Sequence, residues 1–441
     1  MGNVKNNLAD KLRVYAVTER KITGDGSFRD LISAAEAAAR GGATMIQLRE
    51  KNADTEELTM HAQALVNVLR KYGVPVIVDD NPQAAIDAGA AGVHIGQNDM
   101  DPSDARAAIG PDKILGVTAH SAEEAEAAEK AGADYIGAGA VFHTSSKADA
   151  MPLSREELKL ICSAVHIPVV AIGGVNQENI GQLAGTGIAG AAAISAIFGR
   201  ENTTDAAARM ADAVHRALGS DKFKAAIFDY DGTVLDSMPM WESVPSRFAE
   251  ILGHEAEPGL DERVKYMTLE ESAAKFREYG AKGTDSEIVD QIMDMVWYSY
   301  KNELEIKPGI IDVFEEFRSR GIKMAVATQT PSRMIRSANK RLGIDKYFDG
   351  IFSCDDWATT KHFPDIYYIA AASLGAAPCE TLVFEDMIYA GETAENAGFT
   401  VVGIYDESSA KDRAAIESYS RIYLDSYHDW PGIDNIKRED V

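Results

Sequence analysis

Short apolar runs alternate with alanine-rich helical stretches over the first half of the chain. Runs typical of buried parallel strands lie at 14–18, 45–49, 76–80, 92–95, 114–118, 135–141, 169–173 and 191–197. The clearest helical stretches lie between and after them, at 31–40, 56–72, 122–131, 156–165 and 206–218. Eight strand-then-helix units in about 205 residues predict a closed (β/α)8 TIM barrel, with an open doubly wound sheet as the alternative.

A second pattern begins after the polar stretch 219–222, which ends the last barrel helix and precedes a new apolar strand at 225–228. A helical segment rich in Glu, Met and aromatic residues follows, from about 237 to 305, and further strands are expected at 323–328, 350–353, 381–384, 401–404 and 421–424. We therefore predict a barrel domain at 1–220 and a second domain at 221–441. The second is expected to be a Rossmann-like parallel sheet with a helical insertion after its first strand.

Charge and composition narrow the classes of partner. A chain of 441 residues with a formal net charge of −25 repels polyanions, so we expect no nucleic-acid partner. If its ligands are phosphates, local cationic side chains or a divalent cation must offset that charge. We find no signal segment or long apolar stretch and expect a cytoplasmic protein with no membrane contact. Oligomeric state stays open, and the three widely spaced cysteines, Cys162, Cys354 and Cys379, are interpreted as buried thiols.

Two acids follow the first strand of the second domain, in the run Asp229-Tyr230-Asp231-Gly232-Thr233. Residues that directly follow a parallel strand lie at the sheet edge where ligands bind. Two acids at this spacing can divide the work of phosphate transfer, one attacking phosphorus while the other moves a proton to and from the leaving oxygen.

The run resembles the first motif of the haloacid dehalogenase superfamily, and the later motifs follow in order. Thr328 ends a strand where the family binds phosphate, Lys361 stands at the family's lysine, and Glu385-Asp386 stands at its acidic metal motif. The resemblance implies that Asp229 forms a phospho-aspartate, Asp231 is the general acid and base, and Lys361 neutralises phosphate and nucleophile. It also implies Mg²⁺ bound by Asp229, the Asp231 carbonyl and Asp386.

The resemblance further implies that residues 237–305 form a mobile helical cap enclosing a small phosphorylated metabolite. Three positions depart from the family's usual pattern, Gln329, His362 and Met387. Each of the three directly follows a motif residue. We therefore expect them to affect how groups in the site are oriented, and not which groups react.

In the barrel, Gln47, Arg49 and Lys51 share one face by the two-residue period of a strand and form a predicted anion clamp at the catalytic end. Asp80 ends the third strand and Asp99 follows the fourth. Because both lie at the same rim, these carboxylates are candidates for sharing a Mg²⁺ ion.

Together with the ends of strands five to eight, these residues resemble the thiamine phosphate synthase family. The resemblance implies that Gln47, Arg49, Lys51 and Lys147 hold the diphosphate of hydroxymethylpyrimidine diphosphate, with Asp80 and Asp99 on Mg²⁺. It also implies a thiazole phosphate site made by Thr144, Ser146, Gly174, Ile194 and Ser195.

Two substitutions fall among the predicted substrate-binding residues. Thr118 replaces the family's usual Ser and keeps its hydroxyl, whereas Asp79 replaces the usual Asn and adds a negative charge where the pyrimidine or diphosphate would lie. We assign no role to His61, His120 and His143, whose spacing matches no metal motif.

The two resemblances imply a bifunctional enzyme with one Mg²⁺ in each domain. It would make thiamine phosphate and pyrophosphate from the two phosphorylated precursors and hydrolyse a phosphomonoester, which we interpret as thiamine phosphate. Two alternatives stay open: the phosphatase acts on an unrelated sugar phosphate or a damaged precursor, or the barrel is a non-catalytic ligand-binding module.

Overall fold

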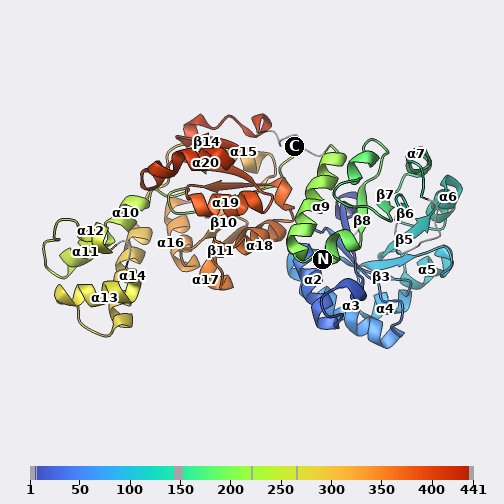
Figure 1. The fold of residues 1–441 in the computed structure, drawn as a ribbon, viewed down its shortest axis with the longest axis horizontal. Coiled ribbons are helices and arrows are strands. Elements are labelled where there is room, and N and C mark those ends of the chain that lie inside the picture. The colour runs from blue at the N-terminus through green and yellow to red at the C-terminus, as the bar shows by residue number, and fades with distance from the viewer. Residues whose placement is uncertain (1–4, 6, 144–151, 220–221, 265–266, 437–441) are drawn as a thin grey trace. The chain divides into compact units, whose positions relative to one another are not determined.

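The computed structural model describes residues 5, 7–143, 152–219, 222–264 and 267–436 (Figure 1). Contacts divide the chain into two compact units, one of residues 1–223 with 371–381 and one of residues 224–370 with 382–441. Among the described helices, none combines the length and the apolar character that crossing a bilayer requires.

Eight parallel strands of the first unit pair in chain order and close into a barrel. They are β1 (Val14–Val17), β2 (Met45–Leu48), β3 (Val76–Asp79), β4 (Gly92–Ile95), β5 (Ile114–Ala119), β6 (Tyr135–Gly139), β7 (Val169–Ile172) and β8 (Gly190–Ala193). Closure confirms the TIM-barrel prediction and excludes the open sheet. It also brings all eight carboxyl ends to one rim, where barrel enzymes build their sites.

Helices follow the barrel strands and begin with side-chain caps at several positions, such as Ser27 before α2 and Asp54 before α3. The barrel helices are α1 (Leu8–Lys11), α2 (Phe28–Arg40), α3 (Thr55–Leu69), α4 (Pro82–Asp87), α5 (Pro102–Ile109), α6 (Ala122–Lys130), α7 (Arg155–Ala164), α8 (Ser195–Phe198) and α9 (Thr203–Ala217).

The strand predicted at 191–197 is too long, because β8 ends at Ala193 and α8 begins at Ser195. A short apolar run suits a buried strand or a buried helical turn equally well, so periodicity does not separate the two. The correction places the predicted residues Ile194 and Ser195 at a strand-to-helix turn.

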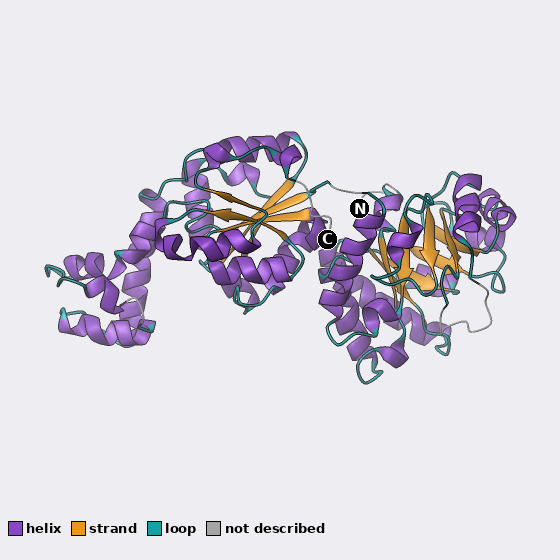
Figure 2. Ribbon diagram, turned by 45° about the horizontal axis from the view of Figure 1, so that its top comes forward, coloured by secondary structure: helices purple, strands orange, loops and turns teal. Residues whose placement is uncertain are grey.

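The second unit is built on a six-stranded sheet in the order β11-β10-β9-β12-β13-β14. Its strands are β9 (Ala225–Phe228), β10 (Lys323–Thr328), β11 (Gly350–Ser353), β12 (Thr381–Glu385), β13 (Thr400–Ile404) and β14 (Ile422–Leu424). Figure 2 shows helices on both faces of this sheet. They are α15 (Ile310–Ser319), α16 (Ser332–Leu342), α17 (Cys354–Trp357), α18 (Asp365–Leu374), α19 (Ile388–Asn396) and α20 (Arg413–Tyr419). This order confirms the Rossmann-like prediction.

The helical insertion lies between β9 and β10, at one end of this unit (Figure 1). It consists of α10 (Met238–Glu242), α11 (Val244–Ile251), α12 (Leu260–Val264), α13 (Leu269–Glu278) and α14 (Asp285–Asn302). We call these five helices the cap. Its longest helix, α14, begins with a capping box between Thr284 and Glu287.

Candidate functional sites

A cavity of about 400 Å³ opens at the carboxyl ends of the barrel strands. Every predicted barrel residue that the structure describes lines it: Gln47, Arg49, Lys51, Asp79, Asp80, Asp99, Thr118, Gly174, Ile194 and Ser195. Thr144, Ser146 and Lys147 lie outside the described residues. The rim thus combines cationic, carboxylate and hydroxyl groups, as binding of a diphosphate with a divalent cation requires.

Carboxylates surround both cations of the anion clamp. Arg49 Nη1 lies 2.8 Å from Glu19 Oε2, and Arg49 Nε lies 3.8 Å from Asp79 Oδ2. Lys51 Nζ lies 3.2 Å from Asp79 Oδ2 and also contacts Asp80. Asp79 therefore faces both clamp cations. Sequence analysis did not single out Glu19, although its position just after β1 was an available signal.

Asp80 and Asp99 lie close enough at the rim for each carboxylate to affect the pKa of the other. Asp99 Oδ2 also accepts a hydrogen bond of 2.8 Å from the Gly96 amide. Burial, and then the charge of Asp79, raise the pKa of Asp80 to about 6. A divalent cation would relieve this repulsion, so the pair fits Mg²⁺.

A chain of hydrogen bonds crosses the barrel interior beneath the cavity. Gln47 Nε2 donates to the Tyr15 hydroxyl at 2.9 Å, and the hydroxyls of Tyr15 and Tyr135 lie 2.9 Å apart. His94 Nδ1 lies 2.9 Å from the Tyr135 hydroxyl, and His94 Nε2 lies 3.0 Å from Thr118 Oγ1. These hydrogen bonds link Gln47 to Thr118, two predicted substrate-binding residues. The three linking residues, Tyr15, Tyr135 and His94, were not among the predicted site residues. Polar side chains inside apolar strands were the available signal.

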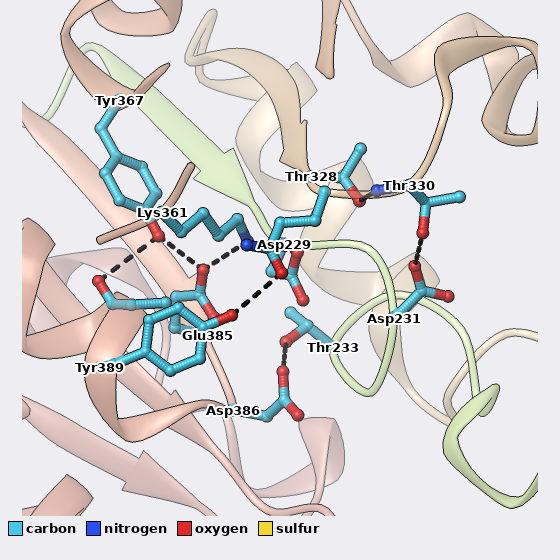
Figure 3. Close-up of polar contacts among 12 residues, drawn as sticks. Asp229, Asp231, Thr233, Thr328, Thr330, Lys361, Tyr367, Glu385, Asp386 and Tyr389 are labelled. Atoms are coloured by element: carbon cyan, nitrogen blue, oxygen red, sulfur yellow. Dashed lines mark hydrogen bonds and ion pairs between the residues drawn. The ribbon is translucent and has the colours of Figure 1, made fainter. Parts of the chain in front are cut away.

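The second site lies where β9, β10 and β12 end, and Asp229 is at its centre (Figure 3). Lys361 Nζ contacts Asp229 Oδ1 and donates to Glu385 Oε1 at 2.6 Å, and the Tyr367 hydroxyl donates to the same Glu385 oxygen at 2.7 Å. Burial raises the pKa of Asp229 to about 7, with Lys361 acting against the rise. Burial alone would lower the pKa of Lys361, but Asp229 and Glu385 raise it above its ordinary value.

Three carboxylates of this site can hold one cation, since oxygen atoms of Asp229, Glu385 and Asp386 lie within 4.8 Å of one another. Asp386 Oδ1 accepts a hydrogen bond of 2.9 Å from Thr233. Its Oδ2 is buried with no hydrogen-bond partner among the described residues, as is Glu385 Oε2. Burial, followed by the charges of Asp229 and Glu385, raises the pKa of Asp386 well above its ordinary value. Mg²⁺ would satisfy the free Asp386 oxygen.

The turn after β9 leaves room for the Asp386 carboxylate. Gly232 has φ 79°, a conformation that favours glycine, and a Cβ atom there would lie 2.4 Å from Asp386 Oδ2. A side chain at this position would therefore crowd the oxygen that has no partner. The glycine of the motif thus keeps this face of Asp386 open to a ligand.

Asp231 is held by hydroxyl groups that sequence analysis missed. Ser237 Oγ donates to its Oδ1 at 2.7 Å, and Thr330 Oγ1 donates to its Oδ2 at 2.7 Å. Tyr300, from the cap helix α14, also donates to Oδ1. Thr330 in turn donates its amide to the hydroxyl of Thr328, the predicted phosphate-binding residue, at 3.0 Å. A buried carboxylate, a lysine and a second carboxylate with several donors together suit nucleophilic attack on phosphorus with proton transfer.

Comparisons with known proteins find similarity in each half of the chain. The family model for thiamine monophosphate synthase matches residues 14–197, and the one for haloacid dehalogenase-like hydrolase matches residues 226–404. A thiamine-phosphate synthase of Clostridium acetobutylicum is 44% identical over 204 residues, which make up 46% of this chain and 95% of that protein.

Two solved structures are each similar to part of this chain. Thiamine phosphate pyrophosphorylase from Pyrococcus furiosus is 39% identical, with a TM-score of 0.44, and the match covers 48% of this chain and 100% of that one. A putative beta-phosphoglucomutase from Thermotoga maritima is 25% identical, with a TM-score of 0.41, and the match covers 46% of this chain and 94% of that one.

Proposed function

We propose that this chain, which belongs to the thiamine-phosphate synthase family through its barrel and carries a haloacid dehalogenase-like phosphatase domain, performs two consecutive steps. The barrel joins hydroxymethylpyrimidine diphosphate to thiazole phosphate, giving thiamine phosphate and pyrophosphate. The second unit hydrolyses thiamine phosphate to thiamine and phosphate. The observation that carries the proposal is the convergence of the predicted residues on one strand-end rim in each unit.

In the barrel reaction the bond between the pyrimidine methylene and the diphosphate oxygen breaks, and the thiazole nitrogen forms the new bond to that carbon. Arg49 and Lys51 stabilise the negative charge that develops on the departing pyrophosphate, together with Lys147. The thiazole phosphate is held by the predicted group Thr144, Ser146, Gly174, Ile194 and Ser195. Gln47 holds the diphosphate with these cations, and Thr118, which lines the same cavity, supplies a hydroxyl for substrate binding.

In the phosphatase reaction Asp229 attacks phosphorus while Asp231 gives a proton to the leaving oxygen. Water then attacks the phospho-aspartate, with Asp231 taking its proton, and phosphate leaves. Lys361 and Thr328 hold the phosphate during both steps. One Mg²⁺ in each site would supply positive charge against the phosphate oxygens, held in the barrel by Asp80 and Asp99 and in the second unit by Asp229, the Asp231 carbonyl and Asp386.

The test uses the full chain with both precursors and Mg²⁺, and mass spectrometry identifies the products. The wild type should release thiamine, whereas Asp229→Asn should stop at thiamine phosphate because the nucleophile is lost. A matched control, Asp345→Asn, changes an exposed carboxylate and should release thiamine like the wild type. A wild type that makes thiamine phosphate but never thiamine would reject the second step alone.

A further inference from the structure

Three side chains that the mechanism does not use meet beside the phosphatase nucleophile. Gln329 follows Thr328, His362 follows Lys361, and Tyr389 lies near the start of α19. The Tyr389 hydroxyl donates to Gln329 Oε1 at 3.1 Å. The rings of His362 and Tyr389 are stacked, with centroids 4.4 Å apart and an angle of 27° between their planes. We call these three residues the aromatic cluster.

The aromatic cluster lies at the open side of the site. Figure 3 shows Tyr389 beside Glu385, close to Asp229. Burial, and then the charge of Glu385, raise the pKa of Tyr389 to about 12. Gln329 and His362 are exposed, whereas Asp229 is buried. A phosphorus atom at Asp229 therefore has its leaving alcohol on the exposed side, because buried strands fill the other.

The chemistry of the aromatic cluster favours a flat ring. An exposed stacked pair offers an aromatic face, and Gln329, whose oxygen accepts from Tyr389, keeps its NH₂ group as a donor for a ring nitrogen. Binding of a polyhydroxyl sugar would call for several polar partners instead.

We propose that the aromatic cluster is the leaving-group subsite of the phosphatase and that it takes the phosphate ester of a flat nitrogen heterocycle. The proposal rests on the phosphatase activity proposed above and specifies its substrate class. It gives a role to two of the three departures from the family pattern, Gln329 and His362.

The test compares thiamine phosphate, hydroxymethylpyrimidine phosphate and glucose 6-phosphate on the full chain with Mg²⁺. His362→Ala and Tyr389→Leu should lower kcat/KM for thiamine phosphate by about two- to tenfold, the range of a lost aromatic contact. In both variants the ratio of kcat/KM for thiamine phosphate to kcat/KM for glucose 6-phosphate should fall. Tyr389→Phe keeps the ring and should keep the preference for thiamine phosphate. His166→Ala, an exposed histidine of the barrel, is the matched control.

The outcomes separate this inference from the proposed function. Equal losses on thiamine phosphate and glucose 6-phosphate, or no loss on either, would overturn the aromatic subsite while leaving thiamine phosphate hydrolysis intact. A wild type that prefers hydroxymethylpyrimidine phosphate, with the preference lost in His362→Ala, would support the subsite and reject thiamine phosphate as substrate. A wild type that prefers glucose 6-phosphate would overturn both. If Tyr389→Leu does not fold, the exposed His362 still carries the test.

Discussion

Tyr300 of the cap donates a hydrogen bond to Asp231, the carboxylate to which we assign proton transfer. The tyrosine lies in the last turn of α14, and its hydroxyl also accepts a hydrogen bond of 3.0 Å from Trp241 in α10. Two cap helices thereby reach the reacting group. The orientation of Asp231 is consequently tied to the position of the cap.

Tyr300→Phe should lower the kcat of phosphate ester hydrolysis by roughly tenfold, the effect expected from losing one hydrogen bond to a charged group. KM should change little, because Tyr300 acts through Asp231. The acid and base limbs of the pH profile of kcat should also move, which a purely structural role would not cause. Steady-state kinetics across pH test this expectation. Tyr298→Phe, on the same helix but 59% exposed, is the control and should behave as wild type.

Asp386→Asn should abolish the Mg²⁺-dependent activity of the phosphatase while stabilising the metal-free protein. The pKa of Asp386 is higher in the folded chain than the ordinary value of about 3.9, which holds in the unfolded chain. Above about pH 3.9 the unfolded chain therefore releases this proton while the folded chain still keeps it. Stability of the metal-free wild type therefore falls as pH rises past that value. The variant removes this cost and keeps an oxygen for Thr233.

Thermal unfolding at pH 7 measures the effect. Without Mg²⁺ the unfolding transition of the second unit should lie about 3 °C higher in Asp386→Asn than in the wild type, and added Mg²⁺ should raise that transition only in the wild type. A variant that Mg²⁺ stabilises as much as the wild type would show that Asp386 does not bind the ion.

Asp79→Asn should lower the KM for hydroxymethylpyrimidine diphosphate by about fivefold, the equivalent of roughly 1 kcal/mol for a partly exposed ion pair. The substitution frees Lys51 and Arg49 from one carboxylate, so both cations are available to the diphosphate. Pyrophosphate release at varied substrate concentration measures it. Asp112→Asn, an exposed carboxylate just before β5 at the other end of the barrel, is the control. A raised KM would mean that Asp79 binds the substrate or its metal.

Local sequence patterns were enough to predict much of the fold and the two groups of site residues at the strand ends. Runs such as those at β3 and β9 are short, apolar and bounded by helical stretches, and this pattern predicts strands. In a parallel sheet, the residue that follows each such strand lies at one common edge. Asp80 and Asp229 were found in this way. The end of β8 was misplaced because its apolar run continues into α8.

The hydrogen-bond partners of the predicted residues could not be predicted from the sequence, because they depend on packing between segments that lie far apart in the chain. Tyr300 lies 69 positions from Asp231, and Tyr135 lies 120 positions from Tyr15. The hydrophobic periodicity of a helix or strand does not indicate which of its tyrosines points inward and contacts a distant polar group. The hydrogen bond between Tyr389 and Gln329 likewise joins helix α19, which follows β12, to the residue after β10, and only the sheet order brings these segments together.

The pair of Lys307 and Asp406 predicts an acid limit to the stability of the second unit. Lys307 Nζ donates to Asp406 Oδ2 at 2.9 Å, and the Asp406 side chain is 4% exposed. Burial opposes the shift, but the hydrogen bond from Lys307 lowers the pKa of Asp406. The carboxylate therefore contributes stability above its unfolded pKa of about 3.9, and this contribution is lost as pH falls through the lower folded value.

Asp406→Asn should cost about 2 kcal/mol at pH 7, because the half-buried Lys307 loses its counter-charge. The difference in free energy of unfolding between the variant and the wild type should shrink as the pH is lowered below 4, where the wild-type carboxylate takes up a proton. Urea unfolding at several pH values measures this difference. Asp434→Asn breaks the exposed pair with Arg320 and should leave stability unchanged at every pH. If the difference in free energy of unfolding between Asp406→Asn and the wild type instead stays constant down to the acid unfolding transition, the asparagine disturbs packing and not charge.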